Sequence, residues 1–264
     1  MGITTNSISM NHYPTNLSDS QWQVIKEFLN DNRRRKYELR TIVNGILYLV
    51  KTGCQWRMLP SDFPKWQLIY YYFNLWKEKG IIENIQYYLV KQIRKLQGRQ
   101  EQPSVGIIDS QSIKSTLVSS REHTGFDGGK RIKGIKRHIV VDTLGLLLSV
   151  AVHPASRADR RGAGYVLDKL RTRWSGVGRL FADGGYPLPG QAGIRIQSLC
   201  GYVMEVVKRS EANVFKVLPK RWIVERTFAW IETSRRNAKS YERLPCTAEA
   251  ITQISAIRMM LKHF

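Results

Sequence analysis

The stretch VGIID, residues 105–109, decides the fold because the pattern of the sequence changes there. Its valine and isoleucine residues form a short apolar run that ends in Asp109, which predicts a buried strand. The segment just before it, residues 98–104 (GRQEQPS), is polar and contains glycine and proline, so it predicts a linker. We therefore expect a helical part before this linker and a mixed α/β part after it.

The segment after Asp109 alternates between strand and helix patterns. The turn DTLG, residues 142–145, is a hairpin signal between two apolar runs. Residues 114–136 contain glycine and many basic residues, and they predict a loop. The predicted strands are residues 138–141, 146–152, 178–182 and 202–207, and the predicted helices are residues 159–174, residues 220–239 and one that follows Pro245. This order predicts an α/β fold in which helices flank a mixed sheet.

The segment before the linker predicts short amphipathic helices that are separated by tight turns. The predicted boundaries are an N-cap at Ser18, helix starts at Glu38, Pro64 and Ile81, and helix ends at Gly53 and Gly80. The basic run RRRK, residues 33–36, lies between the first two helices. This arrangement favours an all-α, helix-turn-helix-like domain that binds DNA. A helical cap that only packs on the rest of the protein would show the same pattern.

The charge balance points to a polyanionic partner. Lysine and arginine total 42 against 21 acidic residues, which gives a formal net charge of +21. Such a surplus costs self-repulsion in the compact state, and a nucleic-acid backbone is the usual partner that offsets it. An anionic membrane or ribosomal RNA would explain the same charge. The charge therefore indicates the class of partner and not the reaction.

The cysteines and the N-terminal sequence indicate a cytoplasmic protein. Cys54, Cys200 and Cys246 are far apart, so neither a disulfide framework nor a zinc site is expected. The first ten residues have neither the basic nor the apolar region of a signal peptide, and the apolar runs are too short to span a bilayer. We expect no membrane partner, and we expect association with the nucleoid when the protein binds DNA.

Three acidic residues form the candidate catalytic and metal-binding set: Asp109, Asp183 and Glu225. The two aspartates follow predicted strands, and ligand sites form at strand ends in α/β sheets. The glutamate lies on a predicted helix beside its apolar stripe, so it can reach over the sheet edge. Carboxylates suit Mg²⁺, and three of them can hold two ions about 4 Å apart for phosphodiester displacement. Each acid alone has an ordinary explanation, such as a turn or a solvated helix position; the combination favours a metal site.

Basic residues near these acids are the candidate DNA contacts. The basic run in residues 130–137 predicts a phosphate-binding loop, although a solvated loop is the ordinary alternative. Arginines also flank Glu225 and would keep it ionised. The complete candidate set is Lys130, Arg131, Lys133, Lys136, Arg137, Arg221, Arg226, Arg235, Arg236, Arg33, Arg34 and Arg35.

Other polar and aromatic residues are expected to have structural roles. Asp142 fits the geometry of a hairpin turn better than a further metal site. His138 and His153 are placed at strand ends, where hydrogen-bonded histidines are more common than DNA contacts. Trp222 and Trp230 are expected to anchor the helix of Glu225 in the core.

Several motifs resemble those of one known family. They are QWRMLP (55–60), IDSQS (108–112), HIVVDTLG (138–145), ADGGY (182–186), PKRWIVERTFAW (219–230) and YERLP (241–245). Together, and in this order, they resemble the DDE transposases of bacterial insertion sequences, specifically the insertion-sequence-five family. The motifs extend over most of the chain, and the set is far more specific than any single motif.

This resemblance implies a function as well as a fold. It implies a ribonuclease H-like catalytic domain at residues 104–264, after a flexible N-terminus at residues 1–16 and the helical DNA-binding domain at residues 17–98. It assigns the catalytic triad to Asp109, Asp183 and Glu225 and a DNA contact to Arg221. It implies cleavage at terminal inverted repeats and strand transfer to target DNA with Mg²⁺ or Mn²⁺. Because two ends must meet, we expect a homodimer or larger oligomer on double-stranded DNA.

Two other functions have to be weighed against transposition. A DNA-binding regulator without catalysis would be expected to have a broken triad, whereas the three acids are present. A structure-specific or RNA-directed nuclease could use the same catalytic domain. The helical N-terminal part and the WIVER block, residues 222–226, favour transposition over a nuclease.

Overall fold

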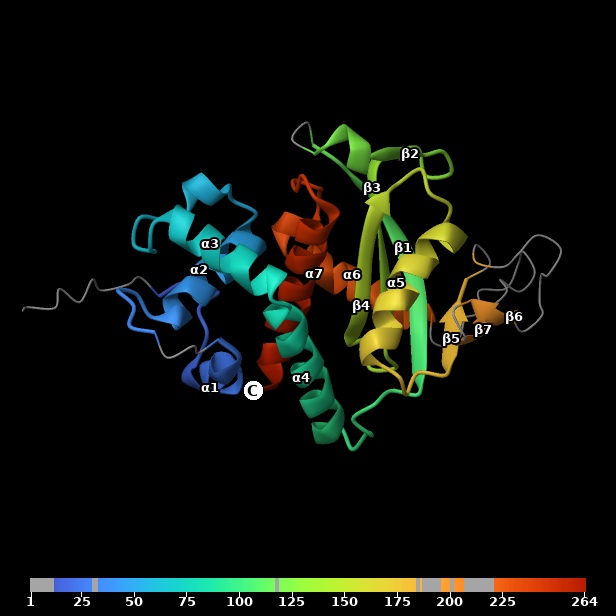
Figure 1. The fold of residues 1–264 in the computed structure, drawn as a ribbon, viewed down its shortest axis with the longest axis horizontal. Coiled ribbons are helices and arrows are strands. Elements are labelled where there is room, and N and C mark those ends of the chain that lie inside the picture. The colour runs from blue at the N-terminus through green and yellow to red at the C-terminus, as the bar shows by residue number, and fades with distance from the viewer. Residues whose placement is uncertain are drawn as a thin grey trace, which may run out of the picture.

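A computed structural model describes residues 12–29, 33–116, 119–183, 186, 196–199, 202–206 and 221–264. Helices on the N-terminal side pack beside a mixed sheet with its own flanking helices (Figure 1). The helices are α1 (Asp19–Leu29), α2 (Leu39–Thr52), α3 (Trp66–Glu78), α4 (Ile81–Leu96), α5 (Asp159–Arg173), α6 (Arg221–Glu232) and α7 (Pro245–Met260). The strands are β1 (Val105–Lys114), β2 (Gly125–Asp127), β3 (Ile132–Val141), β4 (Leu147–Pro154), β5 (Arg179–Ala182), β6 (Ile196–Leu199) and β7 (Tyr202–Val206). None of the helices in these ranges is long and apolar enough to cross a membrane.

The N-terminal helices begin and end close to the predicted residues, and α3 begins at Trp66 instead of Pro64. The Ser18 hydroxyl accepts a hydrogen bond from the Gln21 backbone N–H (3.2 Å), and the Gln21 side chain accepts one from the Ser18 N–H (3.1 Å). This reciprocal pair is a capping box, which satisfies two N–H groups at the start of α1. Gly53 ends α2 with φ of 73°, and Gly80 separates α3 from α4 with φ of 66°. Both angles lie in the left-handed region that glycine adopts most easily.

The sheet combines an antiparallel and a parallel half. β3 pairs with β1 and with β4, both antiparallel, so the first long strands form a meander. β5 then pairs with β1 and with β7, both parallel. α5 makes the crossover between the two halves and covers one face, whereas α6 and α7 cover the other face (Figure 1). The strand order β4-β3-β1-β5-β7 places the end of β5 beside the middle of β1, with β7 on the other side of β5.

The structure corrects several predicted boundaries in the α/β part. β1 continues to Lys114 instead of ending at Asp109, and its second half pairs with the early residues of β3. The predicted loop at 114–136 contains β2 and the start of β3. Polar residues hide the strand pattern here: Lys133 is exposed, and Lys136 is buried because Asp127 and Asp159 pair with it inside the fold. Strand β6 is not among the strands predicted from the sequence.

The helix of Glu225 is shorter than predicted. α6 ends at Glu232, and a 3-10 turn, η3 (Arg235–Asn237), replaces its expected continuation to residue 239. The Thr233 hydroxyl donates to the Trp230 carbonyl (2.8 Å), and the Lys51 ammonium donates to the Thr233 carbonyl (2.6 Å). Threonine and serine side chains that bond local backbone groups compete with helix propagation. The predicted start of this helix at residues 219–220 lies outside the described residues.

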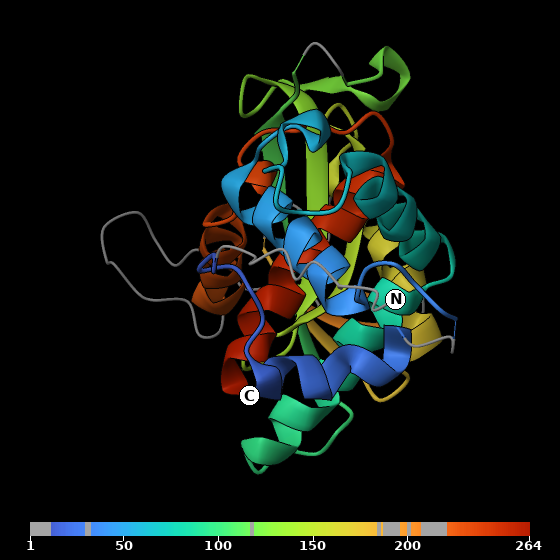
Figure 2. The ribbon, with the colours of Figure 1, turned by 90° about the vertical axis from the view of Figure 1, so that its left-hand side faces the viewer.

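One continuous core joins the helical part to the sheet. α7 lies between β4 on one side and α2 and α4 on the other, as two perpendicular views show (Figures 1 and 2). Buried residues of α1–α4, the sheet, α6 and α7 belong to the same cluster, which includes Leu49, Leu89, Ile139, Val224 and Ile251. The position of each helix therefore depends on residues from both sides of the coil at 98–104.

Candidate active site

The strand pairing brings Asp109 and Asp183 to the same level of the sheet. In the parallel pair, Ile107 of β1 lies opposite Phe181 of β5. Asp109 follows Ile107 by two residues within β1, and Asp183 follows Phe181 by two residues, directly after the end of β5. If the alternation of the strand continues to Asp183, both carboxylates lie on the same face. Neighbouring strands are about 4.8 Å apart, which is a suitable spacing for two carboxylates that share a ligand. Asp109 lies within β1 and not, as the sequence predicted, at its end. It lies at a strand end only in the sense that the neighbouring strand β5 ends beside it.

Tyr186 packs at the centre of this region. Its side chain is buried, and its ring lies edge-on to the His138 ring with 5.9 Å between centroids. Burial, together with the negative charges of Asp109, Asp159 and Asp183, raises the pKa of the Tyr186 hydroxyl well above its usual value. The Tyr186 N–H donates to the Asp183 carbonyl (3.4 Å) and so tightens the turn after β5. Tyr186 is a functional candidate that the sequence motifs did not single out, although its place three residues after Asp183 was a usable signal.

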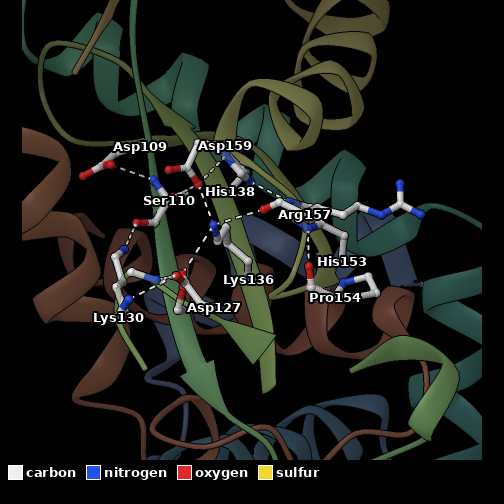
Figure 3. Close-up of polar contacts among 12 residues, drawn as sticks. Asp109, Ser110, Asp127, Lys130, Lys136, His138, His153, Pro154, Arg157 and Asp159 are labelled. Atoms are coloured by element: carbon white, nitrogen blue, oxygen red, sulfur yellow. Dashed lines mark hydrogen bonds and ion pairs between the residues drawn. The ribbon is translucent and has the colours of Figure 1, made fainter. Parts of the chain in front are cut away.

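A network of buried polar groups supports β1 directly behind Asp109 (Figure 3). The Ser110 hydroxyl donates to Asp159 of α5 (2.7 Å), and the Lys136 ammonium lies 2.9 Å from the same carboxylate oxygen. Lys136 also lies 3.4 Å from a carboxylate oxygen of Asp127. Burial raises the pKa of Asp127, but hydrogen bonds from Ser112 and the Lys130 N–H, with the charge of Lys136, outweigh it and lower this pKa to about 2. These contacts fix the backbone that carries Asp109.

Two histidines extend this network under α5. His138 Nδ1 and His153 Nε2 are 2.8 Å apart, and His153 Nδ1 is 2.9 Å from the Pro154 carbonyl oxygen. A carbonyl only accepts, so His153 carries its proton on Nδ1 and accepts from His138 through Nε2. His138 lies in the middle of β3 and not at a strand end, which corrects its predicted position. A Cβ on Gly162 would lie 2.2 Å from His153 Nε2, so only glycine lets α5 approach this pair.

The histidine pair predicts a loss of stability in acid. Burial, and then the neighbouring His153, lower the pKa of His138, and burial also lowers that of His153. Below about pH 6.5 the two histidines bind protons in the unfolded chain but stay neutral in the folded one. The free energy of unfolding therefore falls as the pH falls. Each histidine contributes about 1.4 kcal/mol per pH unit to this slope. We expect His138→Gln to remove one such contribution between about pH 6 and pH 4, as measured by denaturant unfolding at each pH.

Exposed His12 supplies the control for this measurement. His12→Gln should leave the wild-type slope unchanged, because His12 is exposed and lies outside the buried histidine pair. An unchanged slope in His138→Gln would show that this histidine is not held neutral by the fold.

Three contacts position α6, the helix that carries Glu225. The Thr227 hydroxyl donates to the Gly145 carbonyl (2.9 Å), and Arg226 donates to the Leu144 carbonyl (3.0 Å). Both carbonyls belong to the hairpin turn between β3 and β4. At the other end, Gln111 of β1 donates to Glu232 (2.5 Å). α6 is therefore held against both the hairpin and β1.

These contacts place Glu225 on the side of the sheet that carries Asp109. Glu225 is two turns before Glu232 and lies on the same face of α6. Asp109 is two residues before Gln111 and lies on the same face of β1. Because Gln111 and Glu232 meet, Glu225 faces the region near Asp109 from the helix. The side chain of Glu225 is exposed.

The hairpin turn gives a second prediction. Gly145 has φ of 86°, and a Cβ there would lie 3.0 Å from Arg226 Nη2 and from Thr227 Oγ1. Gly145→Ala should therefore both strain the turn and push α6 away from it. We expect a loss of about 1 to 2 kcal/mol in the free energy of unfolding, because a left-handed conformation disfavours a Cβ. Thermal or denaturant unfolding measures this loss.

Gly128→Ala is the matched control for that substitution. A Cβ on Gly128 would meet nothing within 4 Å, so this variant should be as stable as wild type. Equal stability of the two variants would contradict the close packing of α6 on the turn.

The three carboxylates fit a hard cation by their chemistry. Mg²⁺ and Mn²⁺ bind oxygen donors, and Mg²⁺ is usually held by one or two carboxylates with substrate phosphate. Among the described residues, no three histidine, cysteine or acidic side chains lie close enough to bind a metal ion by themselves. The aspartates lie at one level of the sheet, and Glu225 approaches from α6. Substrate phosphate would thus complete the coordination.

The structure places the candidate DNA contacts in two environments. Lys130, Arg131, Lys133, Arg235, Arg33 and Arg34 are exposed. Arg35 is half-buried and donates to the Tyr72 hydroxyl (3.1 Å). By contrast, Lys136, Arg137 and Arg236 are buried. Arg137 donates to the Asn237 side chain (2.9 Å), and Arg236 donates to Glu242 (2.7 Å) and to the Cys54 carbonyl (3.0 Å).

The tryptophans beside Glu225 are not core anchors, which corrects the sequence prediction. Trp222 is 45% exposed and Trp230 is 41% exposed. The Arg226 guanidinium lies 4.6 Å from the Trp222 ring centroid and 4.4 Å from that of Trp230. The three residues follow one another at intervals of one turn along α6, with the half-buried cation between the two exposed rings. The side chain of Arg221 lies outside the described residues.

Asp142 has the structural role that the sequence predicts. It is fully buried in the hairpin turn and accepts hydrogen bonds from the Leu144 and Leu146 N–H groups, both at 2.9 Å. It also forms an ion pair with Arg94 of α4. Asp142 therefore joins the hairpin to the helical part and is not a ligand.

Comparison with known protein families agrees with the resemblance in the motifs. A model described as a transposase of the IS4/5 family matches residues 17–86. A second model, described as a transposase DDE domain, matches residues 100–260, which is more than half of the chain. No curated protein matches the chain.

Proposed function

The chain belongs to the DDE transposases of the IS4/5 type, and on this premise we propose that it cleaves DNA at the ends of an insertion sequence and joins the strands to a target. The observation that carries the proposal is the pairing of β1 with β5, which brings Asp109 and Asp183 to one level of the sheet. Glu225 approaches the same face from α6. The strand order, with an antiparallel meander followed by two parallel strands, supports a ribonuclease H-like description of this part.

Asp109, Asp183 and Glu225 are the proposed catalytic and metal-binding residues. When bound, a pair of Mg²⁺ or Mn²⁺ ions would activate the attacking oxygen and stabilise the leaving oxygen of the phosphodiester. The contribution of the protein is to hold the three carboxylates. The Ser110–Asp159 bond holds β1, and the contacts of Thr227 and Arg226 hold α6. Such preorganisation matters because misplacement by about 1 Å can cost about 100-fold in rate.

The proposed DNA surface consists of the exposed cations of the candidate set. These are Arg33, Arg34, Lys130, Arg131, Lys133 and Arg235, and the resemblance adds Arg221. Arg35 and Arg226 lie at its margin with partners inside the protein. We leave out Lys136, Arg137 and Arg236, because their buried side chains are bonded within the fold. We propose that residues 17–98 bind the terminal inverted repeats and that two or more copies assemble on the DNA.

The test is cleavage of a labelled duplex that carries the element's own end and its flanking DNA. Wild-type protein with Mg²⁺ or Mn²⁺ should cut at the boundary, and a chelator should stop the reaction while binding continues. Binding without cutting in either metal would favour the regulator. Cutting that ignores the end sequence would favour a structure-specific nuclease.

A further inference from the structure

A groove of about 470 Å³ lies where the C-terminal ends of α2 and α7 meet the second half of α6. Leu146 and Leu147 of the sheet form a buried floor, and Trp230 lies at one edge. Its remaining walls carry cations from segments that are far apart in the sequence. None of the residues proposed to hold metal lines this groove.

Three cations line the groove: Lys51, Arg258 and Lys262. A fourth, Arg235, does not line it but lies close enough for its charge to act on Lys51. Lys51 is in the last turn of α2, Arg258 in the last turn of α7, and Lys262 in the 3-10 turn η4 (Leu261–His263). Arg235 reaches the group because α2 ends in Gly53, where a Cβ would lie 3.0 Å from Arg235 Cβ. The bond from Lys51 to the Thr233 carbonyl (2.6 Å) ties the same two segments together.

Within the part of the chain that the structure describes, none of these cations has an acidic partner. No aspartate or glutamate lines the groove, and within the described ranges the side chains of Arg235, Arg258 and Lys262 have neither an ion pair nor a hydrogen bond. Burial and the charges of Arg258, Lys262 and Arg235 lower the pKa of the Lys51 ammonium. Burial also lowers the pKa of Arg258. Folding thus holds like charges together at a cost that a bound anion would relieve.

Helix ends explain only part of this cluster. A cation in the last turn of a helix interacts favourably with the carbonyl groups there, which accounts for Lys51 and Arg258. Arg235 and Lys262, however, lie outside the α-helices, in the turns η3 and η4. Their addition increases the repulsion without a further carbonyl partner. An external anion is the better explanation for all four.

We propose that this groove binds the phosphodiester backbone of DNA at a site separate from the three carboxylates. The inference rests on the proposed function, because a transposase acts on DNA and DNA is therefore the polyanion that this groove is expected to meet. The exposed face of α6 supports a polymer over a small anion, because Trp222, Arg226 and Trp230 form a continuous aromatic and cationic ridge beside Glu225. Trp230 belongs both to this ridge and to the groove. One DNA strand can therefore extend from the catalytic region along α6 into the groove.

The test uses the full chain with Arg258→Gln and Lys262→Gln combined. Neither side chain has a described partner, so the fold should be kept. The matched control, Lys79→Gln with Arg171→Gln, removes the same charge from exposed positions elsewhere. Binding of the element-end duplex is measured by fluorescence anisotropy over a range of salt concentrations, with a chelator present to prevent cleavage. Cleavage is measured separately with Mg²⁺ at saturating DNA.

We expect the groove variant to bind DNA about tenfold more weakly and to lower the salt dependence of log K by about 1 to 2. The control should stay within about twofold of wild type, and cleavage at saturating DNA should be unchanged in both. Equal affinity and salt dependence in the groove variant and the control would overturn the inference, as would a groove that binds inorganic phosphate without affecting DNA. If wild type never cuts but the groove variant still binds more weakly, the groove stands and the catalytic proposal fails.

Discussion

Asp183→Asn and Glu225→Gln are each expected to lower the rate of DNA cleavage by at least about 10³-fold, while the affinity for DNA is kept. Both substitutions keep the size of the side chain and remove one negative charge. A metal ion contributes several kcal/mol of transition-state stabilisation, and each 1.36 kcal/mol is tenfold in rate. Asp109→Asn should behave in the same way because Asp109 lies level with Asp183. Single-turnover cleavage of the element-end duplex measures the rate, and anisotropy measures the affinity.

Glu78→Gln is the control for these substitutions. Glu78 is an exposed glutamate in the last turn of α3, on the helical side of the molecule. Its loss removes the same charge without touching the sheet, so cleavage should match wild type. Glu225→Gln cutting within about threefold of Glu78→Gln would remove Glu225 from the catalytic set, since such a difference is under about 1 kcal/mol.

Local signals predicted the local features of the fold well. Ser18, Gly53 and Gly80 are found at helix boundaries because capping and left-handed turns depend on single residues and their near neighbours. Asp142 was placed in its turn for the same reason. These features need no knowledge of the rest of the chain.

Features that depend on distant partners were not predictable in the same way. Lys136 and Arg137 look like surface cations, yet Asp127, Asp159 and Asn237 make them buried parts of β3. The partners come from segments up to 100 residues away. The basic residues at the start of β3 therefore predicted a loop, whereas the chain forms a strand there. The same limit applies to the exposed tryptophans of α6, whose spacing resembles a core stripe.

Asp109 was chosen as a candidate ligand for a reason that the structure only partly supports. The prediction placed it at the end of a strand, but β1 continues to Lys114. What brings it to Asp183 is the neighbouring strand β5, which is short and parallel. The residue types of the candidate set thus predict its chemistry, which stays a prediction. The register between β1 and β5, which relates Asp109 to Asp183, could not be predicted from the sequence.

Residues 98–104 form a mostly exposed connection, but they do not divide the hydrophobic core into two. Their glycine and proline predicted a connection correctly, and the division into the ranges 17–98 and 104–264 remains a prediction. The structure nevertheless packs α7 against α2 and α4. A buried contact across this coil, between Arg94 and Asp142, is therefore expected to matter for the stability of the whole chain.

Arg94→Met is expected to lower the free energy of unfolding by about 3 to 5 kcal/mol. Arg94 and Asp142 are both buried, and removal of the arginine leaves a buried carboxylate without its cation. Burial raises the pKa of Asp142, whereas hydrogen bonds from the Leu146 N–H and Arg94 oppose that rise. Arg94 also donates to the Gln100 carbonyl (2.7 Å), so the coil loses a support as well. Denaturant unfolding at neutral pH measures the loss.

A double-mutant cycle separates the ion pair from the packing of the arginine stem. Asp142→Asn added to Arg94→Met removes the stranded charge, so the double variant should be more stable than Arg94→Met alone. Arg99→Met, an exposed position on the same coil, should match wild type within about 0.5 kcal/mol. A loss below about 1 kcal/mol in Arg94→Met would mean that water or another group compensates Asp142. The hairpin would then position α6 without help from Arg94, and the two parts would be joined by apolar packing and by contacts such as those of Lys51 with Thr233 and of Arg236 with Cys54.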